Sequence, residues 1–316
     1  VALPELLKRN YDKRMISGLI QAGSSLGILI PPSIVLVLYG MIARQPVSQL
    51  WLAGVGPGLL MTALFLVYIL IRCKINPKMG PILPKEERNF SMKEKLRVLS
   101  AGIIPLLLIF SVIGSFFFGL TSLVESSAFG AFAAFVVALC RRRLTWKIFK
   151  KILRETLDNS AMFMWVMMAA LAFAAVFDGL GAVRALEGLF LNDWGLSPWQ
   201  VLLLMQLSFV ILGIFLDDTA MLVIVAPLYI PLVVKLGFNP IWFGILYTIT
   251  CQIAYITPPF GYNLFVMRAM SPKSITIHDI YASIIPFVGL MLLALVLIMI
   301  FPQIALWLPS LFNTKM

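Results

Sequence analysis

Charged residues are scarce in this chain. They make up 12% of its 316 residues, whereas hydrophobic residues make up 61%. A typical soluble domain is about a quarter charged and about half apolar. The scarcity of charge therefore excludes an ordinary soluble domain. Many apolar stretches of about 20 residues instead predict an all-α, multi-pass membrane protein.

Histidine and cysteine are also rare. His278 is the single histidine, and the three cysteines, Cys73, Cys140 and Cys251, lack metal-ligand spacing. These shortages argue against a zinc enzyme, a Ser-His-Asp hydrolase and a disulfide-linked fold. The sequence also has no G-x-x-x-x-G-K-[ST] loop, which excludes ATP binding by that motif. We expect no enzymatic activity and no organic cofactor.

The net charge of +11 could suggest a nucleic-acid partner. The basic residues, however, form short runs between apolar segments, which is typical of cytoplasmic loops. If the spans alternate and segment 200–235 returns to its own side, nearly all Lys and Arg share one side. The exceptions are Arg44, Arg184, Lys235 and Lys315. We expect a lipid bilayer around the chain and no nucleic acid.

The apolar segments predict an ordered series of helices. Two long segments, 15–43 and 241–267, are broken by Pro31-Pro32 and Pro258-Pro259, and each predicts two half-helices. Segment 200–235 is too long for one crossing and carries Asp217, Asp218 and Thr219 at its centre. We expect a re-entrant hairpin with this polar tip, in which Thr219 either caps the following helix or binds an ion. Ordinary spans are expected at 50–73, 101–119, 123–140, 161–180 and 280–302, surface amphipathic helices at 92–99 and 145–158, and a loop at 181–197.

The two proline pairs mark an internal repeat. They lie 227 positions apart, and at the same offset Pro4 matches Pro231 and Lys8 matches Lys235. Because the first broken segment runs from inside to outside and the second from outside to inside, we expect an inverted repeat. This architecture is typical of secondary transporters, whose sites lie near the membrane midplane. The alternative is coincidence in a proline-containing membrane protein.

The broken segments have the chemistry of a cation site. Each proline removes a backbone donor, and carbonyls left unpaired in lipid are costly unless they face a cavity or bind something. Carbonyls, hydroxyls and a carboxylate together suit Na⁺. The first copy supplies small residues and the hydroxyls of Ser24 and Ser25, and Gln252, Thr257 and Asn263 surround the prolines of the second. The Gly23-x-x-x-Gly27 spacing could alternatively mark a close helix contact. The half-helix N-termini near Ser33 and Phe260 favour an anionic substrate.

Three motifs resemble a known transporter family. Gly27-Ile28-Leu29-Ile30-Pro31-Pro32-Ser33, Thr257 to Phe265 (TPPFGYNLF) and Phe301-Pro302-Gln303 are similar to the large, DctM-type membrane subunit of tripartite ATP-independent periplasmic (TRAP) transporters. The resemblance covers essentially the whole chain. It implies an elevator-type fold with re-entrant hairpins and broken helices, located in the bacterial inner membrane. It also implies Na⁺-coupled uptake of a small organic anion such as a dicarboxylate, sugar acid or sialic acid.

The resemblance also implies partners, domains and site residues. The partners are a small DctQ-type membrane subunit and a periplasmic DctP-type binding protein. The transport domain would comprise 1–43, with the second limb of a first hairpin, and 200–270. Segment 44–199 would hold scaffold spans and 271–316 the last span. Because the chain begins at Val1 without a methionine, we expect that its N-terminal part is missing. The first hairpin tip would lie in this missing part, upstream of Val1.

The site residues expected from the resemblance fall into two groups. The expected Na⁺ loops contain Gly23, Ser24, Ser25, Gly27, Pro31, Gln252, Thr257 and Pro258, and the expected substrate residues are Pro32, Ser33, Asp217, Asp218, Thr219, Pro259, Gly261 and Asn263.

Two other functions remain open at this point. One is a different ion-coupled organic-anion symporter with an inverted repeat. The other, more distant, is an intramembrane enzyme such as an aspartyl protease. That chemistry needs two acids converging from different helices, whereas Asp217 and Asp218 are adjacent. The substrate is not readable from the sequence.

Overall fold

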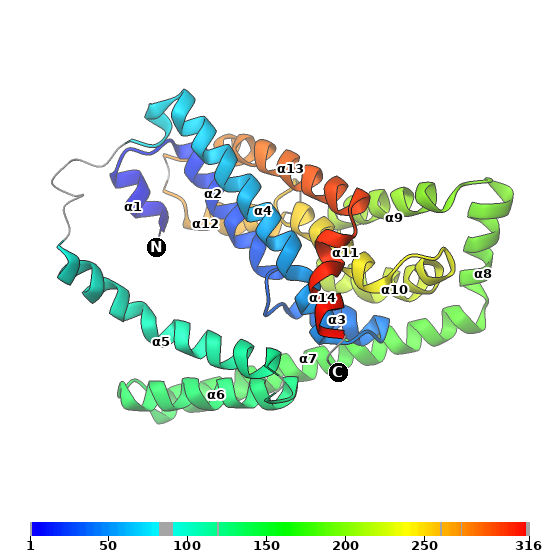
Figure 1. Cartoon of the computed structure of the whole chain (residues 1–316), viewed down its shortest axis with the longest axis horizontal. Helices are drawn as coiled ribbons and strands as arrows, with labels where there is room; N and C mark the ends of the chain where they lie inside the picture. Colours follow the sequence, from blue (N-terminus) through cyan, green and yellow to red (C-terminus); the bar gives the residue numbers. More distant parts are fainter. Residues whose placement is uncertain (1, 82–90, 119, 260, 273, 314–316) are drawn as a thin grey trace. The chain divides into compact units, whose positions relative to one another are not determined.

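The structure is a computed structural model that describes residues 2–81, 91–118, 120–259, 261–272 and 274–313 (Figure 1). The described residues form helices and the turns between them, with no strand among them. The chain divides into two compact units. The first comprises Val1–Ile82 and Val166–Met316, and the second comprises Leu83–Trp165.

The first unit begins with a broken helix. After α1 (Ala2–Lys8), α2 (Lys13–Ser25) continues into the 3-10 turn η1 (Leu26–Ile28), and α3 (Ile34–Ala43) starts after the prolines. The span α4 (Val47–Ile75) follows, and the short turn η2 (Pro77–Met79) ends this part. The prediction that Pro31-Pro32 interrupts a helix is confirmed.

The rest of the first unit holds a helical hairpin and a second broken helix. The helices are α8 (Ala182–Glu187), the π-helix η4 (Gly188–Asp193), α9 (Pro198–Gly213), α10 (Asp218–Lys235), α11 (Pro240–Tyr255), α12 (Tyr262–Met270), α13 (Ile277–Ile300) and α14 (Gln303–Asn313). α9 packs on α10 across the turn at 214–217. The turn and the break at Pro258-Pro259 are therefore confirmed. The side from which the hairpin enters the membrane stays a prediction.

The second unit is built from α5 (Met92–Phe117), α6 (Leu123–Cys140) and the first part of α7 (Trp146–Gly179). α5 packs on α6, and the hydroxyls of Ser115 in α5 and Ser126 in α6 lie 3.3 Å apart. The amphipathic stretch expected at 92–99 is the first part of α5 rather than a separate helix.

Two sequence predictions are wrong between residues 145 and 197. The surface helix expected at 145–158 and the span expected at 161–180 form one continuous helix of 34 residues, α7. The junction between the two predicted helices, Asp158-Asn159-Ser160, contains neither proline nor glycine. Its sequence therefore gives no reason for the helix to stop there. The loop expected at 181–197 is largely helical, as α8 and η4.

Five described helices are long and apolar enough to cross a membrane. They are Val47–Ile75, Leu123–Cys140, Trp146–Phe177, Asp218–Lys235 and Ile277–Ile300. Many of their large apolar side chains are exposed, including Leu70 at 68% and Trp165 at 72%. Exposed apolar surface on this scale is expected where lipid replaces water as the solvent.

The repeat predicted from the prolines is present in the helices. α2 and α11 start 227 positions apart, at Lys13 and Pro240, and α3 and α12 end 227 positions apart, at Ala43 and Met270. The helix caps match as well. The Asp12 side chain accepts a hydrogen bond from Met15 N, and the Asn239 side chain accepts one from Trp242 N at the corresponding place. A carboxylate or amide oxygen at the N-cap satisfies an otherwise unpaired helix donor in both copies.

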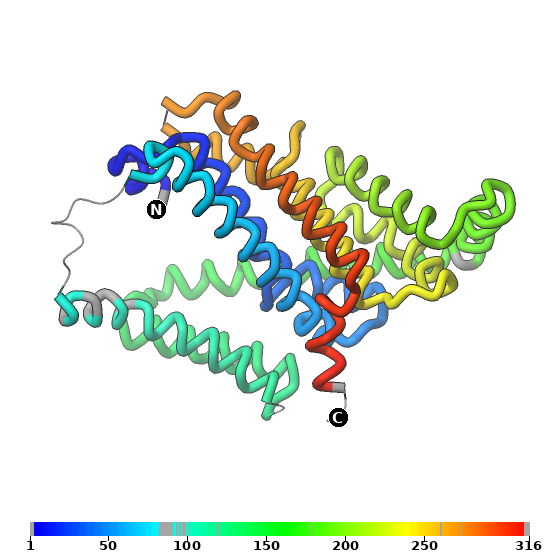
Figure 2. Tube along the Cα trace, turned by 45° about the horizontal axis from the view of Figure 1, so that its top comes forward, coloured from blue at the N-terminus to red at the C-terminus, as the bar shows by residue number. Residues whose placement is uncertain are grey.

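The two copies pack reciprocally and in opposite directions. α2 packs on α12 and α13, while α11 packs on α3 and α4, which is the exchange that a two-fold relation requires. The end of α3 meets the start of α11, where the Tyr39 hydroxyl donates to the Pro240 carbonyl over 2.7 Å. Beyond the end of α12, Ser274 meets the start of α2, where Lys13 Nζ donates to the Ser274 carbonyl over 2.9 Å. The broken helices therefore run antiparallel, as do α4 and α13, which lie side by side in Figures 1 and 2.

Candidate functional site

Several hydroxyl and carbonyl oxygens lie near the prolines of the first broken segment. Ser33 caps α3, because its Oγ accepts a hydrogen bond from Leu36 N over 3.3 Å, and the same hydroxyl donates to the Ile28 carbonyl. The Ser25 hydroxyl is buried and donates to the Ala22 carbonyl over 2.8 Å. The Pro31-Pro32 bond is cis, as is Pro258-Pro259. Ser33 therefore has a structural role, whether or not it contacts substrate.

The second broken segment is tightly folded around Gly261. The Thr257 hydroxyl donates to the Ile253 carbonyl over 2.6 Å, and Gly261 N donates to the Thr257 carbonyl over 3.0 Å. A Cβ at Gly261 would lie 2.9 Å from the Thr257 carbonyl and 3.0 Å from the Tyr255 carbonyl. Only glycine allows this close backbone approach. Phe260, expected at the following half-helix terminus, lies outside the described residues.

The two broken segments meet directly. Gln252 Nε2 donates to the Ser25 carbonyl over 2.9 Å, and Asn263 Nδ2 donates to the Ser24 hydroxyl over 3.2 Å. Gln252 is fully buried, and its Oε1 has no hydrogen-bond partner among the described residues. A buried acceptor of this kind is costly unless something donates to it or a cation binds it. Four residues expected in the ion and substrate sites are thus brought together.

The Gly23-x-x-x-Gly27 motif does not mark a close helix contact among the described residues. A Cβ at either glycine would meet no described atom within 4 Å. Both glycines are exposed. The interpretation of this motif as a helix-packing face is therefore wrong for this part of the fold, and the exposed backbone carbonyls stay open to a ligand.

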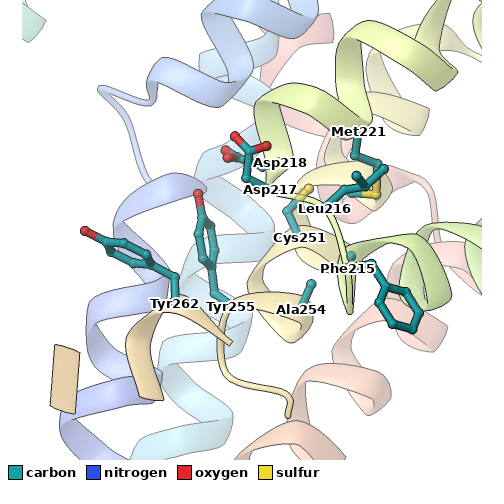
Figure 3. A pocket seen from close by; sticks show the side chains of 10 residues that line it. Phe215, Leu216, Asp217, Asp218, Met221, Cys251, Ala254, Tyr255 and Tyr262 are labelled. Carbon is teal, nitrogen blue, oxygen red and sulfur yellow. The ribbon is translucent and has the colours of Figure 1, made fainter. Parts of the chain in front are cut away.

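A cavity of about 360 Å³ adjoins the second broken helix (Figure 3). Asp217 and Asp218 line it from the start of α10, and the side chains of Tyr255 and Tyr262 line it from the second broken helix. The Tyr255 hydroxyl points toward the two carboxyl groups in Figure 3. The volume of this cavity is in the range of small-ligand sites.

The two aspartates of this cavity have different surroundings. Asp217 is exposed and caps α10, since its Oδ1 accepts a hydrogen bond from Ala220 N over 3.3 Å. Asp218 is half-buried, and its main-chain carbonyl accepts a hydrogen bond from the buried Tyr247 hydroxyl over 2.5 Å. Asp217, and not Thr219, is therefore the helix cap, so the capping role considered for Thr219 is wrong. Thr219 as an ion ligand stays a prediction.

The sequence predictions missed part of this cavity. Cys251, Tyr255, Tyr262 and Met221 line it, whereas Thr219, Pro32, Ser33 and Asn263 do not. Cys251 directly precedes Gln252, and Tyr255 lies one helical turn further on. The helical spacing from Cys251 to Tyr255 was a usable signal, because residues four apart share a helix face.

Comparisons with known proteins agree with this architecture. The family model described as "Tripartite ATP-independent periplasmic transporter, DctM component" matches residues 1–304. The C4-dicarboxylate TRAP transporter large permease protein DctM of Pseudomonas aeruginosa is 31% identical over 98% of this chain and 71% of its own length. The sialic acid large permease SiaM of Vibrio cholerae is 30% identical over 96% of this chain and 69% of its own. The ectoine large permease TeaC of Halomonas elongata is 28% identical over 98% and 70%.

The family model and the alignments with these relatives each cover nearly the whole chain. The chain is a multi-pass helical membrane protein, and it belongs to the DctM family of TRAP transporter large permeases.

Proposed function

We propose that this chain carries substrate and coupling ion across the bacterial inner membrane as the large subunit of a Na⁺-coupled uptake system. The contact between Gln252 and Ser25 is the observation that carries the proposal. It joins the two broken segments, so a ligand bound at one segment would bias the geometry of the other. Broken helices that meet at a repeat interface are where secondary transporters bind substrate and ions.

The oxygens near this contact suit a hard cation. The segments offer main-chain carbonyls, the hydroxyls of Ser24, Ser25 and Thr257, and the unpartnered Oε1 of Gln252. Unwound carbonyls and half-helix ends are the usual Na⁺ ligands of such transporters. Asp217 and Asp218 would also attract a cation, whereas none of the described residues that line their cavity is basic and could attract an anion. We therefore assign the two aspartates to the cation rather than to the substrate.

The substrate proposed is a small organic anion. Relatives named for C4-dicarboxylate and sialic acid transport support this class, although the relative named for ectoine widens the chemistry. The N-termini of α3 and α12 at the broken segments would favour a carboxylate. Pro32, Ser33, Pro259, Gly261 and Asn263 lie on or beside these termini.

Two partner proteins are part of the proposal. A tripartite system needs a small membrane subunit and a periplasmic solute-binding protein besides the large permease. The binding protein would deliver the substrate, and the segments around α2, α3, α11 and α12 would move as one body in an elevator-type cycle. Their reciprocal packing supports such a rigid body.

The experiment is uptake by the intact complex in proteoliposomes, with its binding protein added outside. A panel of C4-dicarboxylates, sugar acids, sialic acid and ectoine would be tested with an inward Na⁺ gradient. We expect saturable, binding-protein-dependent uptake of one acid class. Uptake of none of the acids, or equal uptake without the binding protein, would contradict the proposal.

A further inference from the structure

A second cavity of the first unit lies where α2 begins, α4 ends and α13 begins. It holds about 640 Å³. Arg14, Arg72 and Tyr68 line it together with the apolar side chains of Met15, Pro286 and Phe287. It shares no lining residue with the cavity at Asp217 and Asp218. Transport, as proposed above, gives it no role.

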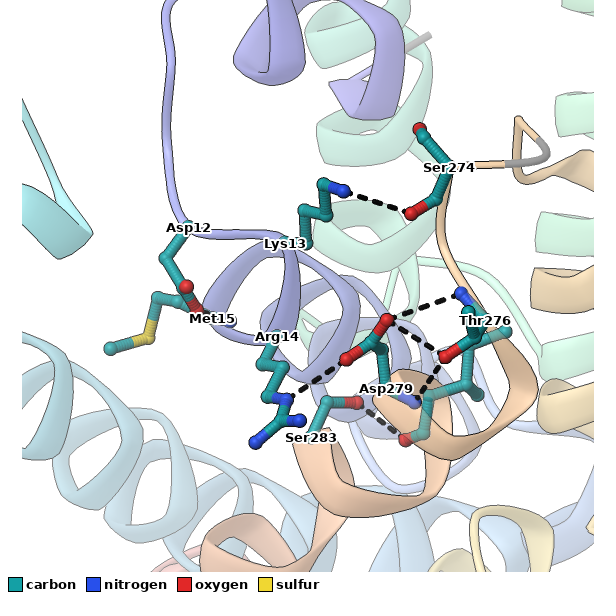
Figure 4. Close-up of polar contacts among 9 residues, drawn as sticks. Asp12, Lys13, Arg14, Met15, Ser274, Thr276, Asp279 and Ser283 are labelled. Atoms are coloured by element: carbon teal, nitrogen blue, oxygen red, sulfur yellow. Dashed lines mark hydrogen bonds and ion pairs between the residues drawn. The ribbon is translucent and has the colours of Figure 1, made fainter.

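The carboxylates around this cavity are already engaged in local structure (Figure 4). Asp279 Oδ1 accepts from Arg14 Nε over 3.0 Å, and Asp279 Oδ2 accepts from the Thr276 hydroxyl over 2.8 Å. Asp12 also lines the cavity, and its Oδ1 accepts from Met15 N over 2.8 Å. Arg72, in contrast, donates a side-chain hydrogen bond to no other described residue. Its guanidinium group is available to a ligand.

The internal repeat shows that the fold does not require this opening. At the offset of 227, Met15 corresponds to Trp242. Trp242 is 2% exposed, and its Nε1 donates to the Ile298 carbonyl over 2.9 Å, so a large side chain fills the related space between α11 and α13. α14 covers α4 at that end as well, where Gly56 approaches the Ile304 carbonyl. One end is packed shut, and the other, lined by arginines, is open.

The surroundings select a ligand with a negative head and an apolar tail. Seven basic residues lie in the two chain segments beside the cavity, namely Lys8, Arg9, Lys13, Arg14, Arg72, Lys74 and Lys78. Three acids, Glu5, Asp12 and Asp279, lie near them, so positive charge is in excess. The charge pattern of the spans assigns this end to the cytoplasm. Basic pockets between membrane helices on that side suit anionic lipid headgroups.

We propose that this cavity binds an anionic phospholipid of the cytoplasmic leaflet. Arg72 and the Nη atoms of Arg14 hold the phosphate, and the Tyr68 hydroxyl lies at the level of the headgroup. The first part of an acyl chain packs against Phe287 and Pro286. The proposal is independent of Na⁺ coupling, since it uses none of the residues expected in the Na⁺ loops or at the substrate.

The test uses the intact complex, stripped of lipid and titrated with phosphatidylglycerol, with binding counted by native mass spectrometry. We expect tighter retention of phosphatidylglycerol than of phosphatidylcholine. Arg72→Gln should weaken phosphatidylglycerol retention about fivefold, the effect of one basic group near a membrane surface. Met15→Trp, which copies the residue of the other repeat, should fill the cavity and abolish retention.

Lys74→Gln is the matched control. It removes a charge from the same end of α4 but does not line the cavity. We expect it to leave retention unchanged. Equal losses in Arg72→Gln and Lys74→Gln would show general surface attraction and overturn the proposal. Equal retention of both lipids, or full displacement by soluble glycerol phosphate, would also overturn it. Arg72→Gln breaks no side-chain hydrogen bond or ion pair among the described residues, so it keeps the test decisive if Met15→Trp does not fold.

Discussion

Gln252 Nε2 donates to the Ser25 carbonyl over 2.9 Å, and the two residues occupy equivalent positions of the inverted repeat, 227 apart. The bond therefore crosses the repeat where each first half-helix ends. Neighbouring Asn263 adds a second bond to Ser24. Together these bonds hold the two broken segments in one arrangement.

Replacing Gln252 by Met should loosen this arrangement. The change removes the donor to Ser25 while keeping a side chain of similar volume, and a lost buried hydrogen bond costs about 1–3 kcal/mol. We expect a lower melting temperature of the purified complex and less stabilisation by Na⁺. Gln21→Met is the control, because Gln21 is also buried but bonds to Ser17 and Ser283 away from the prolines. Loss of Na⁺ stabilisation in both variants would argue against a specific role of Gln252.

Removing the hydroxyls of Ser25 or Thr257 should weaken Na⁺ binding. The Ser25 hydroxyl donates to a carbonyl of its own helix and the Thr257 hydroxyl to a carbonyl of the helix before it, so each oxygen still has a lone pair for a cation. Losing one ligand should cost about 1–3 kcal/mol, or roughly a 5- to 150-fold rise in the Na⁺ concentration for half-maximal uptake. Thr156→Ala removes a hydroxyl with the same intrahelical bond outside the site and should have no effect. Unchanged Na⁺ dependence in Ser25→Ala and Thr257→Ala would refute the assignment.

The two aspartates of the cavity should respond differently to substitution. Asp217→Asn keeps a good helix cap, whereas Asp217→Ala removes it and should cost about 0.5–2 kcal/mol of stability. Asp218→Asn removes a half-buried carboxylate without removing a cap, so it should impair Na⁺-driven uptake more than folding. Thermal unfolding and uptake, measured on the same preparations, separate these effects. Equal stability of Asp217→Asn and Asp217→Ala would contradict the capping role.

A methyl group at Gly18 should disturb the contact between the repeats. A Cβ there would overlap the Ser283 carbonyl and lie 2.6 Å from the Phe287 ring. Overpacking of this kind costs about 1–3 kcal/mol. Gly23→Ala is the matched control on the same helix, because a Cβ at Gly23 meets no described atom within 4 Å. If Gly18→Ala were as stable as Gly23→Ala, the packing of α2 on α13 would be wrong.

The sequence predicts the breaks better than it predicts the contacts. Two adjacent prolines forbid a regular helix, so Pro31-Pro32 and Pro258-Pro259 locate both interruptions, and their spacing identifies the repeat. The polar residues 217–219 likewise locate the turn between α9 and α10. The joined helix α7 was missed because a change from polar to apolar composition at Asp158–Ser160 is no helix stop. Tyr262 was missed as a cavity residue because only the three-dimensional approach of α10 to the second broken helix brings it near Asp218.

The central claim is that the broken segments hold the ion that drives uptake. Its most direct test is uptake of the transported acid by the intact complex in proteoliposomes, under an inward Na⁺ gradient and under an equal K⁺ gradient. We predict accumulation with Na⁺ and background uptake with K⁺. Equal accumulation in both gradients would contradict the account.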